Sequence, residues 1–196
     1  MVPIPRAYKR TFALLVTVFT LGCTATSDSL NKADDTDIGG ETADTGADAV
    51  ALLDFDQWTL LDADRDPTPE HRNPDSSCAP RGVIPEDGVL EVNTNDCGYA
   101  LLGQPIIHPI VAGDTVELLM YHSALSALEE PTEGHFSMWI GDVLFWELNV
   151  SIPAAAEIYF VPVTVDFDVD PATIVRVHLH NHGGNSWRIG HLKRLP

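Results

Sequence analysis

His178 and His180 are the side chains whose type and spacing are best suited to chemistry in this sequence. They are separated by one residue in a segment that alternates apolar and polar side chains. Side chains two residues apart on a β-strand project to the same face, so both imidazoles could bind one metal ion such as zinc. His122 or His135 could add a third ligand, leaving a fourth position for an activated water. The alternative places both histidines on a solvated strand face beside Arg176.

A second group of candidate metal ligands is acidic. Asp62, Asp64 and Asp66 have the alternating spacing with which many calcium-binding loops begin, and calcium is bound by several hard oxygen ligands. An EF-hand loop is excluded, because Pro67 stands where that loop needs glycine and Asn73 stands where it needs glutamate. The three aspartates therefore predict either a looser structural calcium site or an exposed acidic loop.

Two aromatic side chains are candidates for stacking on a sugar ring. Trp139 shares its predicted strand face with polar residues, and Tyr121 lies on the more polar face of another segment. A flat ring exposed on a sheet can stack on the apolar face of a pyranose. We therefore predict a binding platform made of these two rings with Arg176, His178 and His180. The alternative is that both rings are partly buried beneath a loop.

Charge and motifs narrow the range of functions. The chain carries 11 basic and 29 acidic residues, which gives a formal net charge of −18. A chain this acidic repels nucleic acid, so nucleic-acid binding is excluded as a function. The sequence has no serine in a nucleophile elbow and no glycine-rich phosphate-binding loop. Catalysis therefore has no support in the sequence beyond the histidines.

The elements that must position these residues are predicted to be β-strands. Short segments of alternating apolar and polar side chains are separated by turn residues, and helical periodicity is weak throughout. The predicted strands, about nine in number, are 52–61, 89–94, 99–107, 115–123, 135–141, 143–152, 158–169, 174–181 and 187–195. This pattern predicts an all-β fold, an antiparallel β-sandwich or barrel, over residues 51–196.

Three segments, in their order along the chain, resemble the jelly-roll carbohydrate-binding modules, which have a galactose-binding-like fold. Leu53-Asp-Phe-Asp-Gln-Trp58 is similar to the acidic opening strand of these modules and its tryptophan. Residues 111–120 are similar to a mid-chain motif, and residues 187–195 occupy the place of the closing strand. The resemblance implies a jelly-roll sandwich, carbohydrate binding as a function, and a structural calcium ion as a frequent addition.

The amino-terminal segment predicts export. Three basic residues precede an apolar run at 11–22, which is too short to span a bilayer, and Cys23 follows directly. This arrangement resembles the lipobox signal peptide of bacterial lipoproteins. The resemblance implies cleavage before Cys23, acylation of that cysteine and anchoring to the lipid bilayer of the cell envelope. Thr24 resembles the sorting signal for the outer membrane, and without acylation the protein would be secreted.

The other cysteines and an acidic segment are consistent with this interpretation. With Cys23 acylated, Cys78 and Cys97 are left, and an exported protein is expected to join them in a disulfide; the alternative is two free thiols. Residues 24–49 hold seven acidic side chains among small and polar ones, so they bury too little apolar surface to fold. We predict a signal peptide at 1–22, a lipid-anchored disordered linker at 23–50 and a β-sandwich at 51–196.

Three functions remain open from the sequence. The first is a surface lipoprotein whose β-sandwich, without catalysis, is a binding module for a glycan or a surface protein. The second is a metal-dependent enzyme on the same sandwich or on a cupin-like scaffold, with His178 and His180 as ligands. The third is a structural protein that acts through its charge and tolerates substitution of every histidine and exposed aromatic residue.

Overall fold

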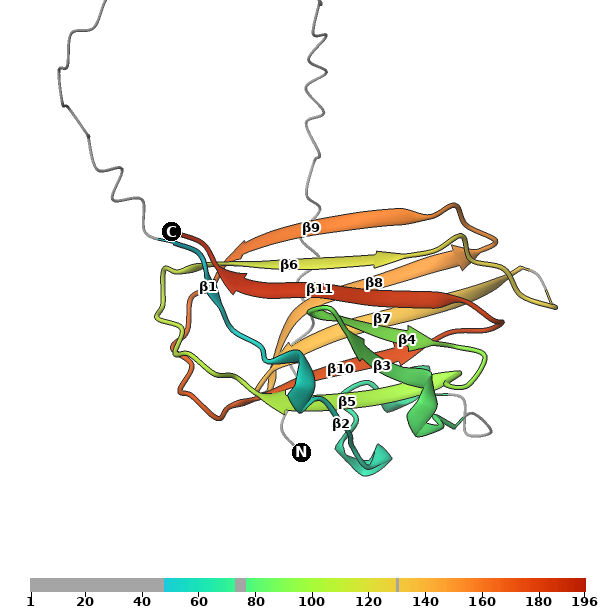
Figure 1. Cartoon of the computed structure of the whole chain (residues 1–196), viewed down its shortest axis with the longest axis horizontal. Coiled ribbons are helices and arrows are strands. Elements are labelled where there is room, and N and C mark those ends of the chain that lie inside the picture. Colours follow the sequence, from blue (N-terminus) through green and yellow to red (C-terminus); the bar gives the residue numbers. More distant parts are fainter. Residues whose placement is uncertain (1–47, 73–76, 130) are drawn as a thin grey trace, which may run out of the picture. The chain divides into compact units, whose positions relative to one another are not determined.

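The computed structural model describes residues 48–72, 77–129 and 131–196, which form two antiparallel β-sheets packed face to face (Figure 1). Within these residues the strands are β1 Val50–Ala51, β2 Thr59–Leu60, β3 Val83–Glu86, β4 Val89–Asn93, β5 Tyr99–Pro105, β6 Thr115–His122, β7 Thr132–Ile140, β8 Val143–Ile152, β9 Glu157–Thr164, β10 Ile174–His180 and β11 Ser186–Arg194. Short 3₁₀ turns are η1 Phe55–Gln57, η2 Ala63–Arg65, η3 Pro69–His71 and η4 Pro80–Gly82. The six-stranded sheet has the order β3-β4-β11-β6-β9, with β1 paired to β11, and the five-stranded sheet has the order β2-β5-β10-β7-β8.

This arrangement confirms the predicted all-β fold and the antiparallel β-sandwich. Most predicted strands are present with their ends displaced by a few residues, and the strand predicted at 158–169 ends earlier, at Thr164. The predicted strand 52–61 is wrong, because η1 lies between β1 and β2. The Asp54 side chain caps this turn by accepting a hydrogen bond from the backbone N–H of Asp56.

Strand β3 was not predicted from the sequence, and it pairs with β4 through a two-residue hairpin turn. Asp87 and Gly88 form this turn with φ angles of 49° and 75°, as a type I′ turn requires at both positions. Pro85 lies within β3, and proline is tolerated there because β3 is at the edge of its sheet.

The core lies between the two sheets and is supplied by alternate positions of the central strands. These positions are Val116, Leu118 and Met120 in β6, and Val175, Val177 and Leu179 in β10. Burying one such side chain stabilises the folded state by roughly 1.5–3 kcal/mol. Because side chains alternate along a strand, the remaining residues of β10 are directed to the outer face of the five-stranded sheet.

The predicted disulfide between Cys78 and Cys97 is present and joins residues 19 positions apart. It ties the segment before η4 to the turn before β5, where Cys97 is fully buried. In the chain-entropy account, a loop of this size stabilises the folded state by about 3 kcal/mol. The prediction that the two cysteines other than Cys23 form a disulfide is therefore confirmed.

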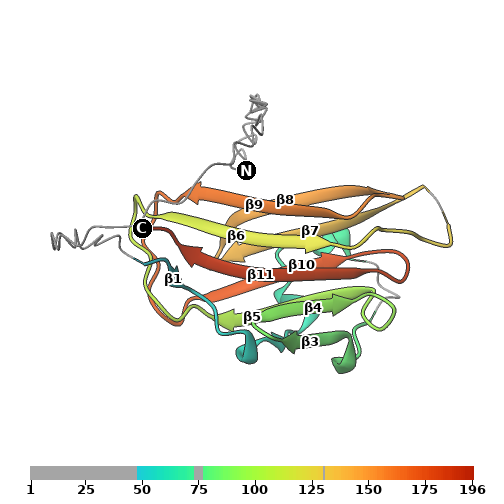
Figure 2. The same cartoon turned by 45° about the horizontal axis from the view of Figure 1, so that its top comes forward.

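The predicted signal peptide, Cys23 and nearly all of the predicted linker lie outside the described residues and stay predictions. In the described part of the chain, no helix has the length and apolar composition needed to cross a membrane. The described chain enters the sandwich at β1, where Val50 pairs with Arg194 near the carboxyl end of β11 (Figure 2).

Candidate functional site

The outer face of the five-stranded sheet carries the predicted histidines of β10. Strand β10 lies between β5 and β7, so its outward side chains are flanked on both sides. The rows across β5, β10 and β7 are Gly103, Arg176 and Trp139; Leu101, His178 and Ser137; and Tyr99, His180 and His135. Strand β8 extends the last two rows with Glu147 and Asn149. Strand register therefore gathers polar and aromatic side chains on one face.

His178 is buried because the loop 61–72 lies over this part of the face. Asp66 of the loop accepts hydrogen bonds from His178 Nδ1 at 2.9 Å and from the Tyr99 hydroxyl at 2.7 Å. The side chains of Asp66 and His178 are both fully buried. Burial alone would raise the pKa of Asp66, but hydrogen bonds from His178, the Thr68 backbone and Tyr99 lower that pKa to about 2. An ionised Asp66 only accepts, so Nδ1 of His178 carries a proton.

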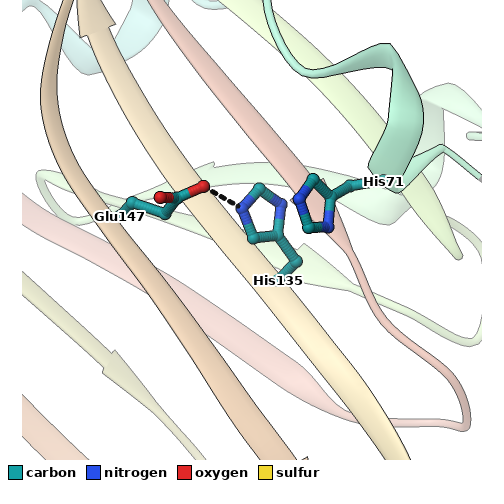
Figure 3. A group of neighbouring side chains, drawn as sticks. All are labelled: His71, His135 and Glu147. Carbon is teal, nitrogen blue, oxygen red and sulfur yellow. Dashed lines mark hydrogen bonds and ion pairs between the residues drawn. The ribbon is translucent and has the colours of Figure 1, made fainter. Parts of the chain in front are cut away.

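His135 is held by contacts on several sides. Its Nε2 lies 2.9 Å from Glu147 Oε1, and its ring stacks on His71 with centroids 3.8 Å apart and planes 13° apart (Figure 3). The His178 ring meets it edge-on, with centroids 4.9 Å apart. Burial lowers the pKa of His135, the hydrogen bond to Glu147 partly opposes this, and His178 and His71 lower the pKa further. The His135 ring is therefore neutral at neutral pH.

His180 is the next histidine of β10 on this face, and its ring centroid lies 4.8 Å from that of His182. Burial, followed by repulsion from His182 and the other nearby histidines, lowers the pKa of His180 to about 4. The His180 ring is therefore also neutral at neutral pH. A neutral imidazole keeps a lone pair with which it accepts a hydrogen bond or binds a metal ion.

An open cleft of about 480 Å³ lies beside His180 at this end of the face. Its lining residues all have polar side chains, which are those of Glu70, His71, Arg72, Thr132, Glu133, His135, Asn149, His180 and His182. A volume of this order is in the range of small-ligand sites. The lining side chains can both donate and accept hydrogen bonds, so the cleft suits a ligand with many polar groups.

Arg176 and Trp139 lie at the other end of the same face. Arg176 donates to the backbone carbonyl of Gly141 and to the Asp142 carboxylate, the latter at 2.9 Å. The indole Nε1 of Trp139 donates to Ser137 Oγ at 3.2 Å, and the Trp139 side chain remains partly exposed. Arg176 is therefore engaged within the protein, whereas the Trp139 ring keeps surface available for a ligand.

The predicted pairing of Tyr121 with Trp139 in one platform is wrong, because the two rings belong to different sheets. Tyr121 lies in β6 of the six-stranded sheet, and the guanidinium of Arg188 lies 5.8 Å from its ring centroid. Of the other predicted platform residues, Arg176, Trp139 and His180 are on the outer face of the five-stranded sheet. His178 shares that face but is buried.

His122, one of the two predicted third ligands, also lies in the six-stranded sheet. It is buried in β6, with Nδ1 2.8 Å from the Ser123 carbonyl oxygen and Nε2 3.3 Å from the Tyr159 hydroxyl. Both ring nitrogens are thus engaged far from β10, and the prediction for His122 is wrong. His135, the other predicted third ligand, contacts the ring of His178.

The predicted calcium site at the three aspartates is also wrong. Asp66 is buried against His178, whereas Asp62 and Asp64 are exposed to solvent. The group of potential metal ligands found among the described residues contains no aspartate. The alternating spacing does not bring the three carboxylates together because Asp66 points into the protein to accept hydrogen bonds.

His71 and Glu147 were not among the site residues predicted from the sequence. His71 lies in a proline-containing loop with no periodic pattern, so nothing local indicated where it would fold. Aligning the β7–β8 hairpin across its two-residue turn would place Glu147 opposite Phe136, on the core side of the sheet. The bulge at Met138 and Trp139 shifts that alignment by one residue, so Glu147 lies opposite Ser137 and contacts His135.

No model of a known protein family matches this sequence, and no curated protein matches it. Solved structures similar to this chain include carbohydrate-binding modules. One, described as "CBM4 structure and function", is 12% identical with a TM-score of 0.39 and covers 72% of this chain and 96% of its own. The second N-terminal cellulose-binding domain of a Cellulomonas fimi β-1,4-glucanase is 17% identical with a TM-score of 0.37, and the match covers 76% of this chain and 97% of that domain. The enzymatically active domain of a bacteriophage tailspike protein is 16% identical with a TM-score of 0.37, over 73% of this chain and 20% of its own.

Proposed function

We propose that the β-sandwich is a carbohydrate-binding module whose ligand lies in the cleft on the outer face of the five-stranded sheet. The observation that most supports this proposal is that every residue lining the cleft has a side chain with a polar group. Sugar hydroxyls both donate and accept hydrogen bonds, and the lining offers carboxylate, amide, imidazole and guanidinium groups as partners. An apolar ligand would leave such groups without partners, at a cost of about 1–3 kcal/mol for each one that becomes buried.

The charge of the protein favours a neutral glycan over an acidic one. The whole chain has a formal net charge of −18. Within the cleft, Glu70 and Glu133 lie beside a single arginine, Arg72. His180, which burial keeps neutral, adds no positive charge. A polysaccharide rich in carboxylate or sulfate groups would therefore be repelled.

The position of Trp139 favours an oligosaccharide over a single sugar. Trp139 and His135 project to the same face of β7 four residues apart, a distance of about 14 Å along a strand. A ligand that occupies the cleft and also stacks on Trp139 must span this distance. Affinity should therefore rise with the length of the glycan chain until the ligand reaches Trp139.

A glycan array of neutral and acidic oligosaccharides, followed by calorimetric titration of the positive ligands, tests this proposal. Asn149 lies in the cleft wall on the edge strand β8 and is exposed, so Asn149→Ala should weaken binding while leaving the fold intact. Trp139→Ala should weaken binding of long ligands more than that of short ones. Tyr121→Ala, an aromatic substitution on the opposite sheet, is the matched control and should leave affinity unchanged.

Two results would contradict the proposal. The first is an array on which the full chain binds no neutral glycan. The second is a titration in which Tyr121→Ala reduces affinity as much as Asn149→Ala does, because the binding surface would then lie elsewhere.

We also propose that the protein is exported and anchored to the cell envelope through Cys23. The basic start, the short apolar run and the directly following cysteine support this proposal. The Cys78–Cys97 disulfide agrees with an oxidising compartment. Metabolic labelling with palmitate, comparing the natural chain with Cys23→Ser, is the test. Equal labelling of the two chains, or no labelling of the natural chain, would refute the anchoring.

A further inference from the structure

Three side chains converge on one point of the five-stranded sheet in a way that carbohydrate binding does not require. His71, His135 and Glu147 each offer one ligand atom, and these atoms all lie within 4.8 Å of one another (Figure 3). They come from the loop 61–72, from β7 and from β8. Residues from three segments of the chain are therefore brought together by the fold and not by local sequence.

Unpartnered ring nitrogens in the same region are an independent observation. His135 and His178 are 3% and 0% exposed, yet His135 Nδ1 and His178 Nε2 have no hydrogen-bond partner among the described residues. His180 Nε2 is also buried without a hydrogen-bond partner among the described residues. A buried polar atom without a partner destabilises the folded state, so such atoms are rare in native proteins. Of these three histidines, His135 belongs to the cluster with His71 and Glu147, and a ligand bound beside its ring would supply the missing partner.

The surrounding carboxylate and imidazole contacts resemble the supporting shell of a metal site. Asp66 fixes the His178 ring through Nδ1, and His178 packs edge-on against His135. The rings of metal-binding histidines are commonly held in place by hydrogen-bonded neighbours outside the ligand set. The His178 ring, which Asp66 holds, therefore limits the movement of the His135 ring.

We propose that His71, His135 and Glu147 bind one zinc ion, or another first-row divalent transition metal ion, at the edge of the cleft. Two imidazole nitrogens and one carboxylate oxygen form a donor set that suits zinc, whereas calcium and magnesium take oxygen ligands. Ligand atoms around a tetrahedral zinc ion lie about 3.4 Å apart, as bond lengths near 2.1 Å require. The His71 and His135 rings stack with planes 13° apart, so the His71 ring must turn out of this stack for the in-plane lone pairs of both rings to reach one ion. His71 is on a loop and Glu147 is on an edge strand, where side chains have room to move.

The metal ion would face the cleft, because His71 and His135 both line it. Three protein ligands leave a coordination position open, as in zinc sites that bind an exchangeable molecule. This inference goes beyond the proposed carbohydrate binding, since neither the donor set nor the unpartnered nitrogens depend on a glycan.

Titration of the chelator-treated full chain, without a histidine tag, with zinc chloride tests the proposal, and calorimetry gives the stoichiometry and affinity. We expect one zinc ion per chain. His71→Ala and Glu147→Gln should each weaken zinc binding by about 100-fold or more. Titration with cobalt chloride should give the visible absorption of low-coordinate cobalt in the natural chain and lose it in both variants.

Two control variants separate this site from general binding by histidines. His182→Ala removes an exposed histidine of the same cleft, and His191→Ala removes a histidine–glutamate contact of 3.1 Å on the other sheet. Both should retain the zinc affinity of the natural chain. Circular dichroism and the urea midpoint should show that all variants are folded.

The proposal is overturned if zinc does not bind at one ion per chain, or if His71→Ala and Glu147→Gln bind zinc as tightly as the natural chain. An equal loss of zinc affinity in His191→Ala would also overturn the proposal. Asn149→Ala should weaken glycan binding without changing zinc affinity. Failure of the metal site and failure of the carbohydrate proposal are therefore separate results.

Discussion

Replacing Asp66 by asparagine tests whether a buried charge holds the loop 61–72 on the five-stranded sheet. Asparagine keeps the shape of the side chain and removes its charge. The charge-assisted hydrogen bonds from His178 and Tyr99, at 2.9 and 2.7 Å, become ordinary ones. Because the Asp66 side chain is fully buried, water cannot compensate for this change.

The expected loss follows from the pKa of Asp66, which falls from 3.8 to about 2 in the folded protein. That difference corresponds to about 2 kcal/mol of stability at neutral pH. Because the folded-state pKa of Asp66 is depressed, this stabilisation is fully present above about pH 4 and is lost as the pH falls through about 2. Asp66→Asn should therefore lower the free energy of unfolding by about 2 kcal/mol at pH 6, and the difference should vanish near pH 2.

Urea unfolding followed by tryptophan fluorescence, repeated between about pH 6 and pH 2, measures this difference between the two chains. Asp62→Asn is the matched control, because Asp62 is exposed on the same loop and its substitution should change stability by less than about 0.5 kcal/mol. A difference between natural and Asp66→Asn chains that stays constant over the whole pH range would refute the reasoning. So would a difference at pH 6 no larger than that of the control.

Further substitutions test other features of the fold. Replacing Cys78 and Cys97 by serine should lower the free energy of unfolding by about 3 kcal/mol in urea titrations, and added reductant should then have no further effect. Gly183→Ala should lower the free energy of unfolding by well over 1 kcal/mol, because φ is 88° and the added β-carbon would overlap the backbone before β7. Gly88 has a φ of 75° with open space around it, so Gly88→Ala should lower that free energy by about 1–2 kcal/mol. Tyr99→Phe removes a hydrogen bond to a buried carboxylate, so the acid-unfolding midpoint measured by circular dichroism should move to higher pH; an unchanged midpoint would contradict this.

Alternation in the sequence predicted strands well wherever one face of a strand is buried and the other is not. Strand β6 is the clearest case, since buried and partly exposed residues alternate along its full length. The prediction failed over 52–61, where Leu52 and Leu53 are both buried and Asp54 caps a turn. It missed β3 because Pro85 is atypical of strands and is tolerated there by the edge position.

The site was predicted in part, because a local pattern specifies the face of a strand but not the sheet that the strand joins. The spacing of His178 and His180 placed both on one outer face, which the register of β10 confirms. The same reasoning joined Tyr121 to Trp139 wrongly, since β6 and β7 are consecutive along the chain but belong to opposite sheets. His71 reaches the cluster from a loop, and only the folded chain reveals that contact.

The pairing of β1 with β11 has a practical consequence for how this domain can be handled. Val50 pairs with Arg194, whereas the cleft lies beside the turn that precedes Ser186 at the other end of β11. Eight residues of extended chain separate these two ends, a distance of about 27 Å. Both ends of the sandwich therefore leave it side by side and away from the cleft. A fluorescent label, a solid support or a fusion partner attached at either end would leave the cleft accessible, and the domain could be inserted into a surface loop of another protein.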